Sequence, residues 1–149
     1  MGDVLKSAYL RTKAVDYIQR WIGTPYTWGG DDFSSFDCSG LVVEVLQAVG
    51  AIPHGSDFSA AALYKKFEDG AIERGYVGCL VFWYSGDADE KIIHVEMMVD
   101  DFHSVGASGG GSKTKTIADA IRQNAYVKQR PIGYRGDKYL IVDPFKVED

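Results

Sequence analysis

Cysteine is scarce in this sequence, with two copies in 149 residues. Cys38 and Cys79 allow at most one disulfide bridge, which excludes a small fold held together by several bridges. A native bridge between the two is not the expected state. With only these two cysteines and three histidines, the usual ligand spacings of a structural zinc site cannot be assembled, and the sequence predicts no metal.

Positively charged residues are also few: the sequence has 16 Lys and Arg residues against 21 Asp and Glu residues, and its net charge is −5. Phosphate backbones require clustered basic side chains, so the composition disfavours a nucleic-acid partner. No apolar run approaches the roughly 18 residues of a membrane span. The N-terminus lacks the apolar run of a secretory signal, so we expect no membrane partner and no export signal.

Hydrophobic residues make up 46% of the sequence and charged residues 25%, which is typical of one globular domain covering residues 1–149. The apolar spacing predicts helices at 5–21, 41–49, 57–67 (capped by Asp57 or Ser59) and 116–124. Residues rich in β-branched and aromatic side chains predict strands at 79–84, 92–99, within 102–108, at 126–134 and at 139–145. Helices followed by strands predict an α+β fold with helices packed on an antiparallel sheet.

One stretch, "SSFDCSG" at residues 34–40, places Cys38 between a turn-rich loop and the predicted helix. Cys38 is therefore either an inert buried thiol or a nucleophile. The N-terminus of a helix stabilises a thiolate through free N–H groups and the helix dipole, which favours the second interpretation. A nucleophilic thiol also needs a base.

His94 is the best candidate for that base, because it lies inside a predicted strand. Alternation places His94, Glu96 and Met98 on one face and Val95, Met97 and Val99 on the other. If the second face joins the core, the first faces whatever packs across the sheet, and the Cys38 helix is one possibility. The alternative is that His94 is a core histidine with satisfied hydrogen bonds.

The stretch "GTPYTWGG" followed by "FDCSGLV" resembles the motif of the NlpC/P60 cysteine peptidases, which hydrolyse peptide bonds in bacterial cell walls. Downstream, "VGCLVFWYSG" resembles the first sheet strand of that family and "IIHVEMMV" its histidine strand. The resemblance runs from about Ala14 to about Arg135. It implies a papain-like core, with the nucleophile at a helix N-terminus and the base on a central antiparallel strand, and no cofactor.

The same resemblance implies roles for individual residues. Cys38 attacks the scissile carbonyl, while His94 takes the thiol proton and later protonates the leaving amine. The backbone N–H of Cys38 and the hydroxyl of Tyr26 bind the oxyanion. Asp37 and Ser39 hold the substrate, often its free amine; helix capping is the alternative role for both, and the two roles are compatible.

The sequence departs from the family at the third polar residue, which orients the imidazole from about a dozen positions after the base. Gly106 stands there and has no side chain. A three-residue loop after Val99 would place Glu96 opposite Gly106 and on the face of His94, about 7 Å along the strand. We therefore predict that Glu96 fills the space left by Gly106 and accepts a hydrogen bond from His94; the alternative is a solvent-exposed glutamate.

Other residues have weaker claims. His103 is on the wrong face or too far along the strand in either register, and Ser108, opposite His94, is a lesser candidate for the orienting residue. Cys79 is predicted to be core, His54 to lie on the surface or beside the cleft, and Gly109 to Gly111 to form a flexible rim. Trp28 and Trp83 are interpreted as packing residues.

The family resemblance therefore predicts a cysteine hydrolase that cleaves an amide bond in peptidoglycan stem peptides, near D-glutamate or diaminopimelate, through a thioester. The alternatives are a lapsed binding or virion-structural module on the same fold, suggested by Gly106, and an amidase or acyltransferase with another substrate. The absence of a signal is typical of a phage-encoded enzyme, in the virion or released by lysis, or of a bacterial cytoplasmic one. The oligomeric state is left open.

Overall fold

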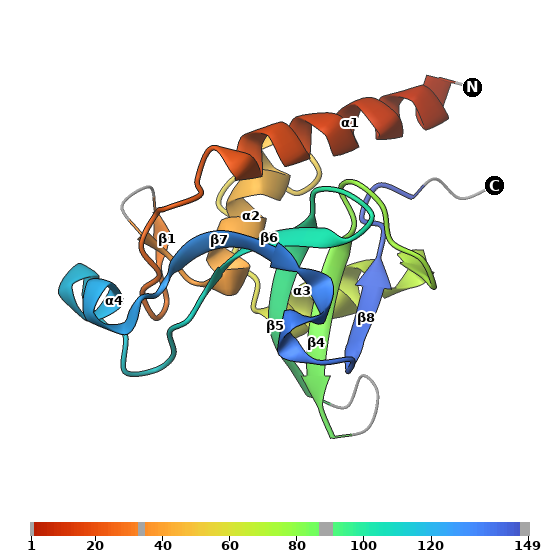
Figure 1. Ribbon diagram of the computed structural model, residues 1–149. Helices are drawn as coiled ribbons and strands as arrows, with labels where there is room; N and C mark the ends of the chain where they lie inside the picture. Colours follow the sequence, from red (N-terminus) through yellow and green to blue (C-terminus); the bar gives the residue numbers. More distant parts are fainter. Residues whose placement is uncertain (1, 33–34, 87–90, 147–149) are drawn as a thin grey trace.

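The computed structural model describes residues 2–32, 35–86 and 91–146, and its centre is a six-stranded antiparallel sheet (Figure 1). In spatial order the strands are β3 (Ala71–Ile72), β8 (Tyr139–Val142), β4 (Leu80–Ser85), β5 (Lys91–Met98), β6 (His103–Ser108) and β7 (Tyr126–Pro131). A separate pair, β1 (Asp31–Asp32) and β2 (Ser35–Phe36), lies within the predicted loop before Cys38. The predicted α+β fold is confirmed.

The four predicted helices are present with shifted ends: α1 (Gly2–Gln19), α2 (Cys38–Ala48), α3 (Ala60–Phe67) and α4 (Ile117–Gln123). Of the two predicted caps of α3, Ser59 is the one used, because its hydroxyl accepts a hydrogen bond from the Ala62 N–H at 3.1 Å. A capping box between Thr116 and Asp119 begins α4. In Figure 1, α4 lies at the far end of the molecule from β8.

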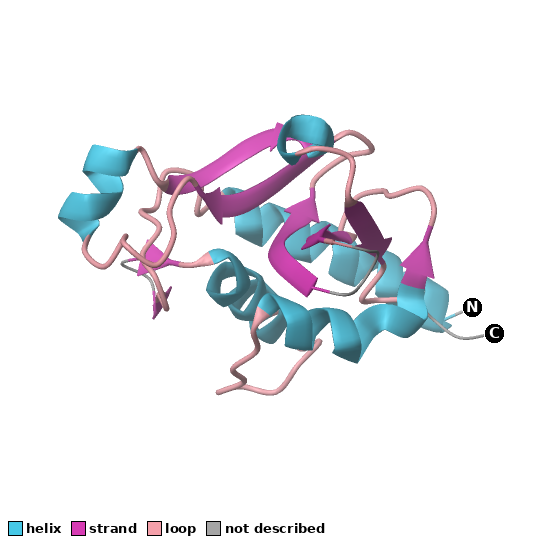
Figure 2. Ribbon diagram, turned by 90° about the horizontal axis from the view of Figure 1, so that it is seen from below, coloured by secondary structure: helices cyan, strands magenta, loops and turns pink. Residues whose placement is uncertain are grey.

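Helices α1, α2 and α3 pack on one face of the sheet, and Figure 2 shows most of the helical layer on one side of the strands. Val95 and Met97 of β5 face this layer and are completely buried with Leu41 and Val42 of α2. The Cys38 helix packs on the Val95 and Met97 face of the sheet, so the possibility that it covers the face of His94, Glu96 and Met98 is not realised. Its first residue, Cys38, nevertheless lines a cleft together with His94.

The second face of the sheet has its own small core of Cys79, Val81, Trp83, Met98 and Ile141. It is covered by η2 (Ile132–Arg135), a single 3₁₀ turn that follows β7. The predicted strand 126–134 therefore ends at Pro131, and residues 132–135 fold back over the sheet instead of extending it. Likewise the strand predicted at 139–145 ends at Val142.

The hairpin between β5 and β6 has the register of the three-residue loop. Met97 pairs with Val105 and Met98 with Ser104, and the Val99 N–H donates to the His103 carbonyl at 2.9 Å. Beyond these pairs, β6 continues beside β7 and leads away from β5 (Figure 1). This divergence gives the N-terminus of α2 access to β5.

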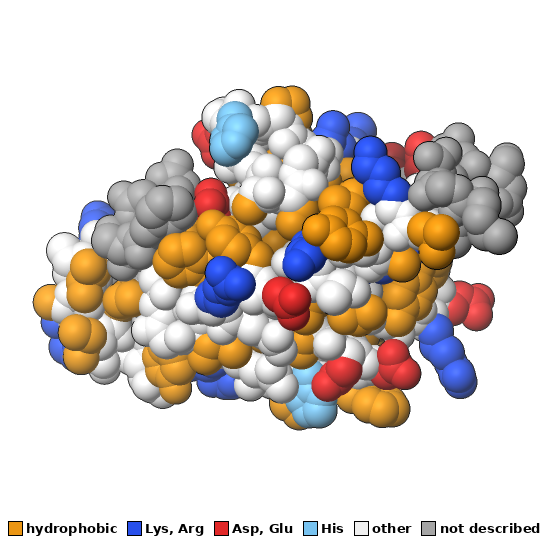
Figure 3. All heavy atoms as spheres, turned by 90° about the horizontal axis from the view of Figure 1, so that it is seen from above, with side chains coloured by type: hydrophobic (Ala, Val, Ile, Leu, Met, Phe, Trp, Pro, Cys, Tyr) orange, Lys and Arg blue, Asp and Glu red, His pale blue; other side chains and the backbone are white. Residues whose placement is uncertain are grey.

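Helix α1 is amphipathic over its second half only. Ala14 and Ile18 are buried, whereas Leu5 and Tyr9, predicted on the same apolar face, are 65% and 61% exposed. Figure 3 views the molecule from the α1 side, where hydrophobic side chains alternate with single charged ones. Within the described residues, no helix combines the length and apolar character needed to cross a membrane.

Candidate active site

Cys38 is the first residue of α2, and the residues around it explain why the helix begins there. The Asp37 carboxylate accepts hydrogen bonds from the Gly40 N–H at 2.7 Å and the Ser39 hydroxyl at 3.3 Å. The Gly30 carbonyl, which accepts from the Asp37 N–H, would lie 2.1 Å from a Cβ on Gly40. Glycine at position 40 thus lets the preceding loop lie against the first turn of α2 and fixes the half-buried Cys38 thiol at its N-terminus.

His94 meets Cys38 where β5 and β6 diverge: both side chains line one cleft, and the neighbouring Cys38 side chain favours the charged form of His94. A β-bulge on β5 lies next to this histidine, since Trp83 pairs with His94 but Tyr84 pairs with Ile92. The unpaired residue, Ile93, is 46% exposed at the mouth of the cleft, whereas strict alternation would have turned it toward the core. The bulge therefore gives His94 its position beside the thiol and leaves an apolar side chain on the rim.

Glu96 occupies the space that Gly106 leaves. A Cβ on Gly106 would lie 2.2 Å from the Glu96 Cγ and 2.6 Å from its Cδ, closer than any real contact. The Glu96 side chain crosses this space and its Oε2 lies 2.7 Å from His94 Nε2. The glutamate is 1% exposed, so the alternative of a solvent-exposed glutamate is wrong. The predicted contact of Glu96 with the His94 ring is confirmed.

Two further residues bind the Glu96 carboxylate, and neither was predicted from the sequence. The Tyr134 hydroxyl donates to Oε2 at 2.6 Å, and the Ser104 hydroxyl donates to Oε1 at 2.8 Å. Ser108 is 4% exposed, lines the cleft, and opposes the rise that burial and Glu96 cause in the pKa of Tyr134, so it belongs to the outer part of this network. Ser104 lies diagonally across the hairpin from Glu96, so the register of the three-residue loop could have predicted this contact. Tyr134 reaches Glu96 only because the chain forms the η2 turn, which no local sequence pattern indicated.

The hydrogen bonds and charges around His94 and Glu96 favour the charged form of each side chain. Burial lowers the pKa of His94, but the hydrogen bonds and charges of Cys38 and Glu96 outweigh burial and leave that pKa above its ordinary value of 6.5. Burial raises the pKa of Glu96, but His94, Tyr134 and Ser104 reverse this and leave it below its ordinary value. With Nε2 committed to Glu96, Nδ1 is the ring nitrogen available to Cys38.

A cleft of about 510 Å³ opens over this pair, and Asp37 and Ser39 line it beside Cys38. Tyr26 lies on its wall and is 6% exposed. Burial, together with the negative charges of Cys38 and Asp37, raises the pKa of Tyr26, so its hydroxyl is a protonated donor at neutral pH. A Cβ on Gly110 would lie 2.4 Å from the Tyr26 ring, so the predicted glycine rim packs directly against this tyrosine.

Residues 23–131, well over half of the chain, match the model of the NlpC/P60 family. The chain belongs to the NlpC/P60 family. Among curated proteins, a probable endopeptidase of Mycobacterium tuberculosis is 47% identical over 47 residues, which are 31% of this chain and 12% of that protein. The chain thus spans only about an eighth of the length of such relatives.

Solved structures of NlpC/P60 proteins have the same fold. The NlpC/p60 domain of the peptidoglycan hydrolase SagA has a TM-score of 0.62 and 21% identity, over 88% of this chain and 97% of that domain. The P60 domain of an antigen of Mycobacterium avium subspecies paratuberculosis has a TM-score of 0.64 and 20% identity, over 95% of this chain and 98% of that one.

The remaining candidates lie apart from Cys38 and His94. The His103 ring hydrogen-bonds to the Asp100 carboxylate in the exposed hairpin loop. This agrees with the prediction that His103 does not orient His94. His54 is exposed and lies beyond the described lining of the cleft. Cys79 is completely buried in the second core, and burial raises its thiol pKa to about 11.

The two tryptophans differ from each other. Trp83 is 2% exposed, and its ring centroid lies 5.4 Å from that of His94, so it packs as predicted. Trp28 is 59% exposed and lines the cleft, so its interpretation as a packing residue is wrong. Its place on a loop before Cys38, outside any buried strand, is what leaves its ring on the surface.

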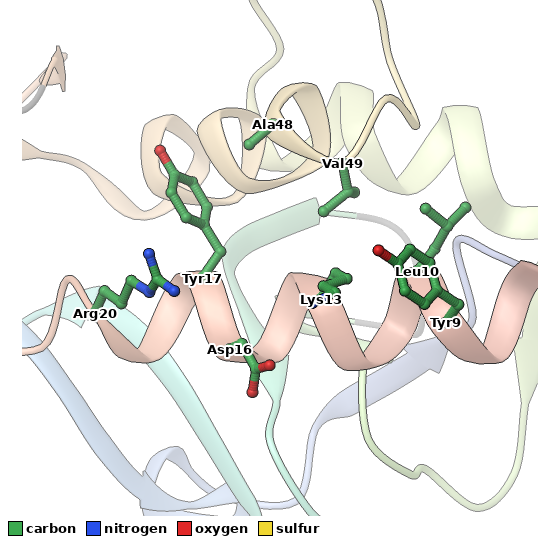
Figure 4. A pocket seen from close by; sticks show the side chains of 8 residues that line it. All are labelled: Tyr9, Leu10, Lys13, Asp16, Tyr17, Arg20, Ala48 and Val49. Atoms are coloured by element: carbon green, nitrogen blue, oxygen red, sulfur yellow. The ribbon is translucent and has the colours of Figure 1, made fainter.

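A second hollow, between α1 and α2, shares no lining residue with the Cys38 cleft (Figure 4). Its lining is Tyr9, Leu10, Lys13, Asp16, Tyr17, Arg20, Ala48 and Val49. The Tyr17 hydroxyl donates to the Glu44 carboxylate at 2.8 Å and joins the two helices. The hollow contains neither cysteine nor histidine. Across the described ranges, no group of three or more His, Cys, Asp or Glu side chains is placed to hold a metal ion.

Proposed function

We propose that this NlpC/P60 domain, residues 1–149, is a cysteine hydrolase that cleaves an amide bond in peptidoglycan stem peptides. The observation that carries the proposal is the Cys38 thiol at a helix N-terminus, in one cleft with a histidine that a buried glutamate holds. Names of relatives, a probable endopeptidase and a peptidoglycan hydrolase, support the substrate class. In this proposal, the cleaved bond lies next to D-glutamate or diaminopimelate.

The chemistry follows from the positions of these side chains. The thiol proton passes to His94, and the Cys38 sulfur attacks the scissile carbonyl carbon to give a tetrahedral oxyanion. The Cys38 N–H and the Tyr26 hydroxyl donate hydrogen bonds to that oxyanion. When the C–N bond breaks, His94 gives its proton to the leaving amine and a thioester remains. His94 then takes a proton from water, which attacks the thioester and restores the thiol.

Glu96 acts through His94 in this proposal. Its carboxylate keeps the ring turned so that Nδ1 faces the thiol, and its negative charge stabilises the imidazolium that forms when the thiol loses its proton. Asp37 and Ser39 line the cleft next to Cys38, where a carboxylate and a hydroxyl are suited to bind the free amine of the peptide. The lapsed-site alternative depended on the missing side chain at Gly106, and Glu96 fills that place.

Digestion of purified muropeptides, followed by mass spectrometry, tests the function. We expect a new amine at one stem-peptide position, and a loss on the order of 10⁴-fold or more in the Cys38→Ala variant. No new amine at any stem-peptide position would defeat the peptidoglycan assignment. A product that retains a transferred acyl group would instead identify an acyltransferase.

Alkylation by iodoacetamide near neutral pH tests the nucleophile separately, and the chain has its own control. We expect Cys38 to react quickly, because its partly exposed thiol lies at a helix N-terminus in one cleft with the His94 imidazole. Cys79 is buried and its pKa is about 11, so it should react only after unfolding. Equal, slow labelling of both cysteines would mean that Cys38 is an ordinary thiol.

A further inference from the structure

Arg135 lies at the end of η2 and lines the same cleft as Cys38 and His94. Its guanidinium carbon lies 6.0 Å from the centroid of the Trp83 ring, which in turn packs against His94. The positive charge of Arg135 acts on both the Tyr26 and the Tyr134 hydroxyl groups, opposing the rise in their pKa values. The guanidinium is therefore electrostatically close to the reacting groups.

The guanidinium of Arg135 has no carboxylate partner among the described residues. Two other arginines are paired, Arg11 with Asp143 at 2.6 Å and Arg122 with Asp119. No other lysine or arginine appears among the described residues that line the cleft. A guanidinium presents parallel N–H donors in a fixed plane that match the two oxygens of a carboxylate, and in Arg135 these donors are available to a ligand in the cleft.

The backbone that carries Arg135 is fixed at several points. The Ile132 N–H donates to the Phe102 carbonyl at 2.9 Å, and the Gly136 N–H donates to the Gly133 carbonyl at 3.0 Å. Between them, the Tyr134 hydroxyl is bound to Glu96. The residue that anchors η2 to the catalytic histidine network is thus the immediate neighbour of Arg135, so the main chain that presents the guanidinium is held in place before substrate arrives.

We propose that Arg135 binds a carboxylate of the substrate beside the scissile amide, and so selects stem peptides in which that group is free over those in which it is a carboxamide. The inference rests on the proposed hydrolase function. Asp37, at the Cys38 side of the cleft, has the opposite charge and suits an amine. The cleft that contains Cys38 thus has complementary charges for a short zwitterionic peptide.

Two pairs of synthetic stem peptides test the proposal. One pair differs only in a free α-carboxylate or a carboxamide on the D-glutamyl residue, and the other differs only at the side-chain carboxylate of diaminopimelate. We expect kcat/KM to favour the carboxylate member of one pair by about 10- to 100-fold, the range of a charge-assisted pair. The pair that shows the preference identifies which carboxylate reaches Arg135.

Arg135→Gln should abolish that preference by lowering kcat/KM for the carboxylate peptide, mainly through KM, while the carboxamide peptide is cleaved as before. Arg135→Lys should keep a smaller preference, because lysine retains the positive charge but lacks the two parallel N–H donors of a guanidinium. The matched control is Lys138→Gln, which removes a nearby exposed charge outside the described lining of the cleft; the Lys138 ammonium donates to the Gly86 carbonyl at 3.1 Å. Cleavage of both peptides should be unaffected by it.

Loss of activity on both members of a pair in Arg135→Gln, or a wild-type enzyme without any carboxylate preference, would overturn the role of Arg135. Peptide binding to the Cys38→Ala variant, measured by calorimetry with and without Arg135→Gln, separates this from a failure of the hydrolase proposal. If the wild type cleaves none of the peptides, the hydrolase proposal is wrong. Carboxylate-selective binding that disappears with Arg135→Gln would then still support the role of Arg135, and unselective binding would overturn it.

Discussion

Glu96 and Asp143 are two buried carboxylates that are held in nearly the same way in different parts of the molecule. Each has almost no exposed surface, at 1% and 2%. Each accepts from one cationic side chain, one tyrosine hydroxyl and one further donor. For Glu96 the donors are His94, Tyr134 and Ser104; for Asp143 they are Arg11, Tyr76 and the backbone N–H of Phe145.

The difference between the two lies in the cation and its surroundings. The Arg11 guanidinium is always charged, and its ion pair with Asp143 joins α1 to the chain that follows β8. The role of this pair is structural. His94 can gain or lose its charge, with a pKa raised above its ordinary value of 6.5, and it borders the cleft that contains Cys38. The comparison teaches that the buried carboxylate itself does not indicate catalysis; an ionisable partner that reaches a cleft does.

Removal of the Glu96 charge should have the largest effect on activity. In Glu96→Gln we expect kcat to fall about 10- to 100-fold, because the His94 ring loses its orienting acceptor. The pKa of His94 should fall as well, so the high-pH limb of the kcat/KM profile should move to lower pH. Steady-state kinetics across pH measure both effects, and unchanged activity with an unchanged profile would show that Glu96 has no such role.

The same variant changes how stability depends on pH. The raised pKa of His94 gives a stabilisation that is complete below its ordinary pKa of 6.5 and is lost as pH rises through the raised value. The lowered pKa of Glu96 gives one that is present above its ordinary pKa of 4.5 and is lost as pH falls. The pair therefore stabilises the fold most between about pH 4.5 and pH 6.5. In Glu96→Gln, the free energy of unfolding, measured by urea denaturation at a series of pH values, should lack this maximum and vary less with pH.

Asp143→Asn should show the opposite combination. The free energy of unfolding should fall by about 3 kcal/mol, because Arg11 loses the counter-charge in a pair that is mostly buried. Activity per folded molecule should not change, since neither residue borders the cleft. Urea denaturation and kinetics at a temperature where the variant is folded measure the two quantities. A loss of kcat equal to that of Glu96→Gln would break the comparison.

The smallest effects are expected from the two tyrosines, Tyr134→Phe and Tyr76→Phe. Each loses one hydrogen bond to a buried carboxylate, at 2.6 Å and 2.5 Å, and should cost about 1.5 kcal/mol of stability. Only Tyr134→Phe should also lower kcat, by a few-fold, because Glu96 keeps Ser104 as a donor. Equal kcat values in the two variants would place Tyr134 among purely structural residues.

Local sequence signals were enough for much of the fold and the centre of the site. The α+β order, the position of Cys38 at a helix start and the contact between Glu96 and His94 followed from spacing, family resemblance and hairpin register. Strand alternation transmits such information because a residue's face is fixed by its number. The contact of Glu96 with His94 needed only one further assumption, the length of one loop.

The features that were missed all depend on parts of the chain far apart in sequence. The packing face of α2 is decided by the helices and strands together, and alternation alone cannot say which face of β5 they choose. Tyr134 and Arg135 reach the site because the chain turns after Pro131, although residues 132–134 have the composition of a strand. Trp28 is exposed because its loop borders a cleft that forms only when α2 and β5 meet.

The Glu96 side chain occupies the space that a side chain at position 106 would need. This restricts the order in which the two positions can be substituted. Any side chain added at 106 first would collide with the Glu96 Cγ, 2.2 Å from the new Cβ. A replacement at 96 first would leave His94 without its acceptor and the pocket partly empty. An imidazole or amide at position 106 can therefore be reached only through an intermediate that is impaired in packing or in catalysis, so the two residues behave as a single inherited unit.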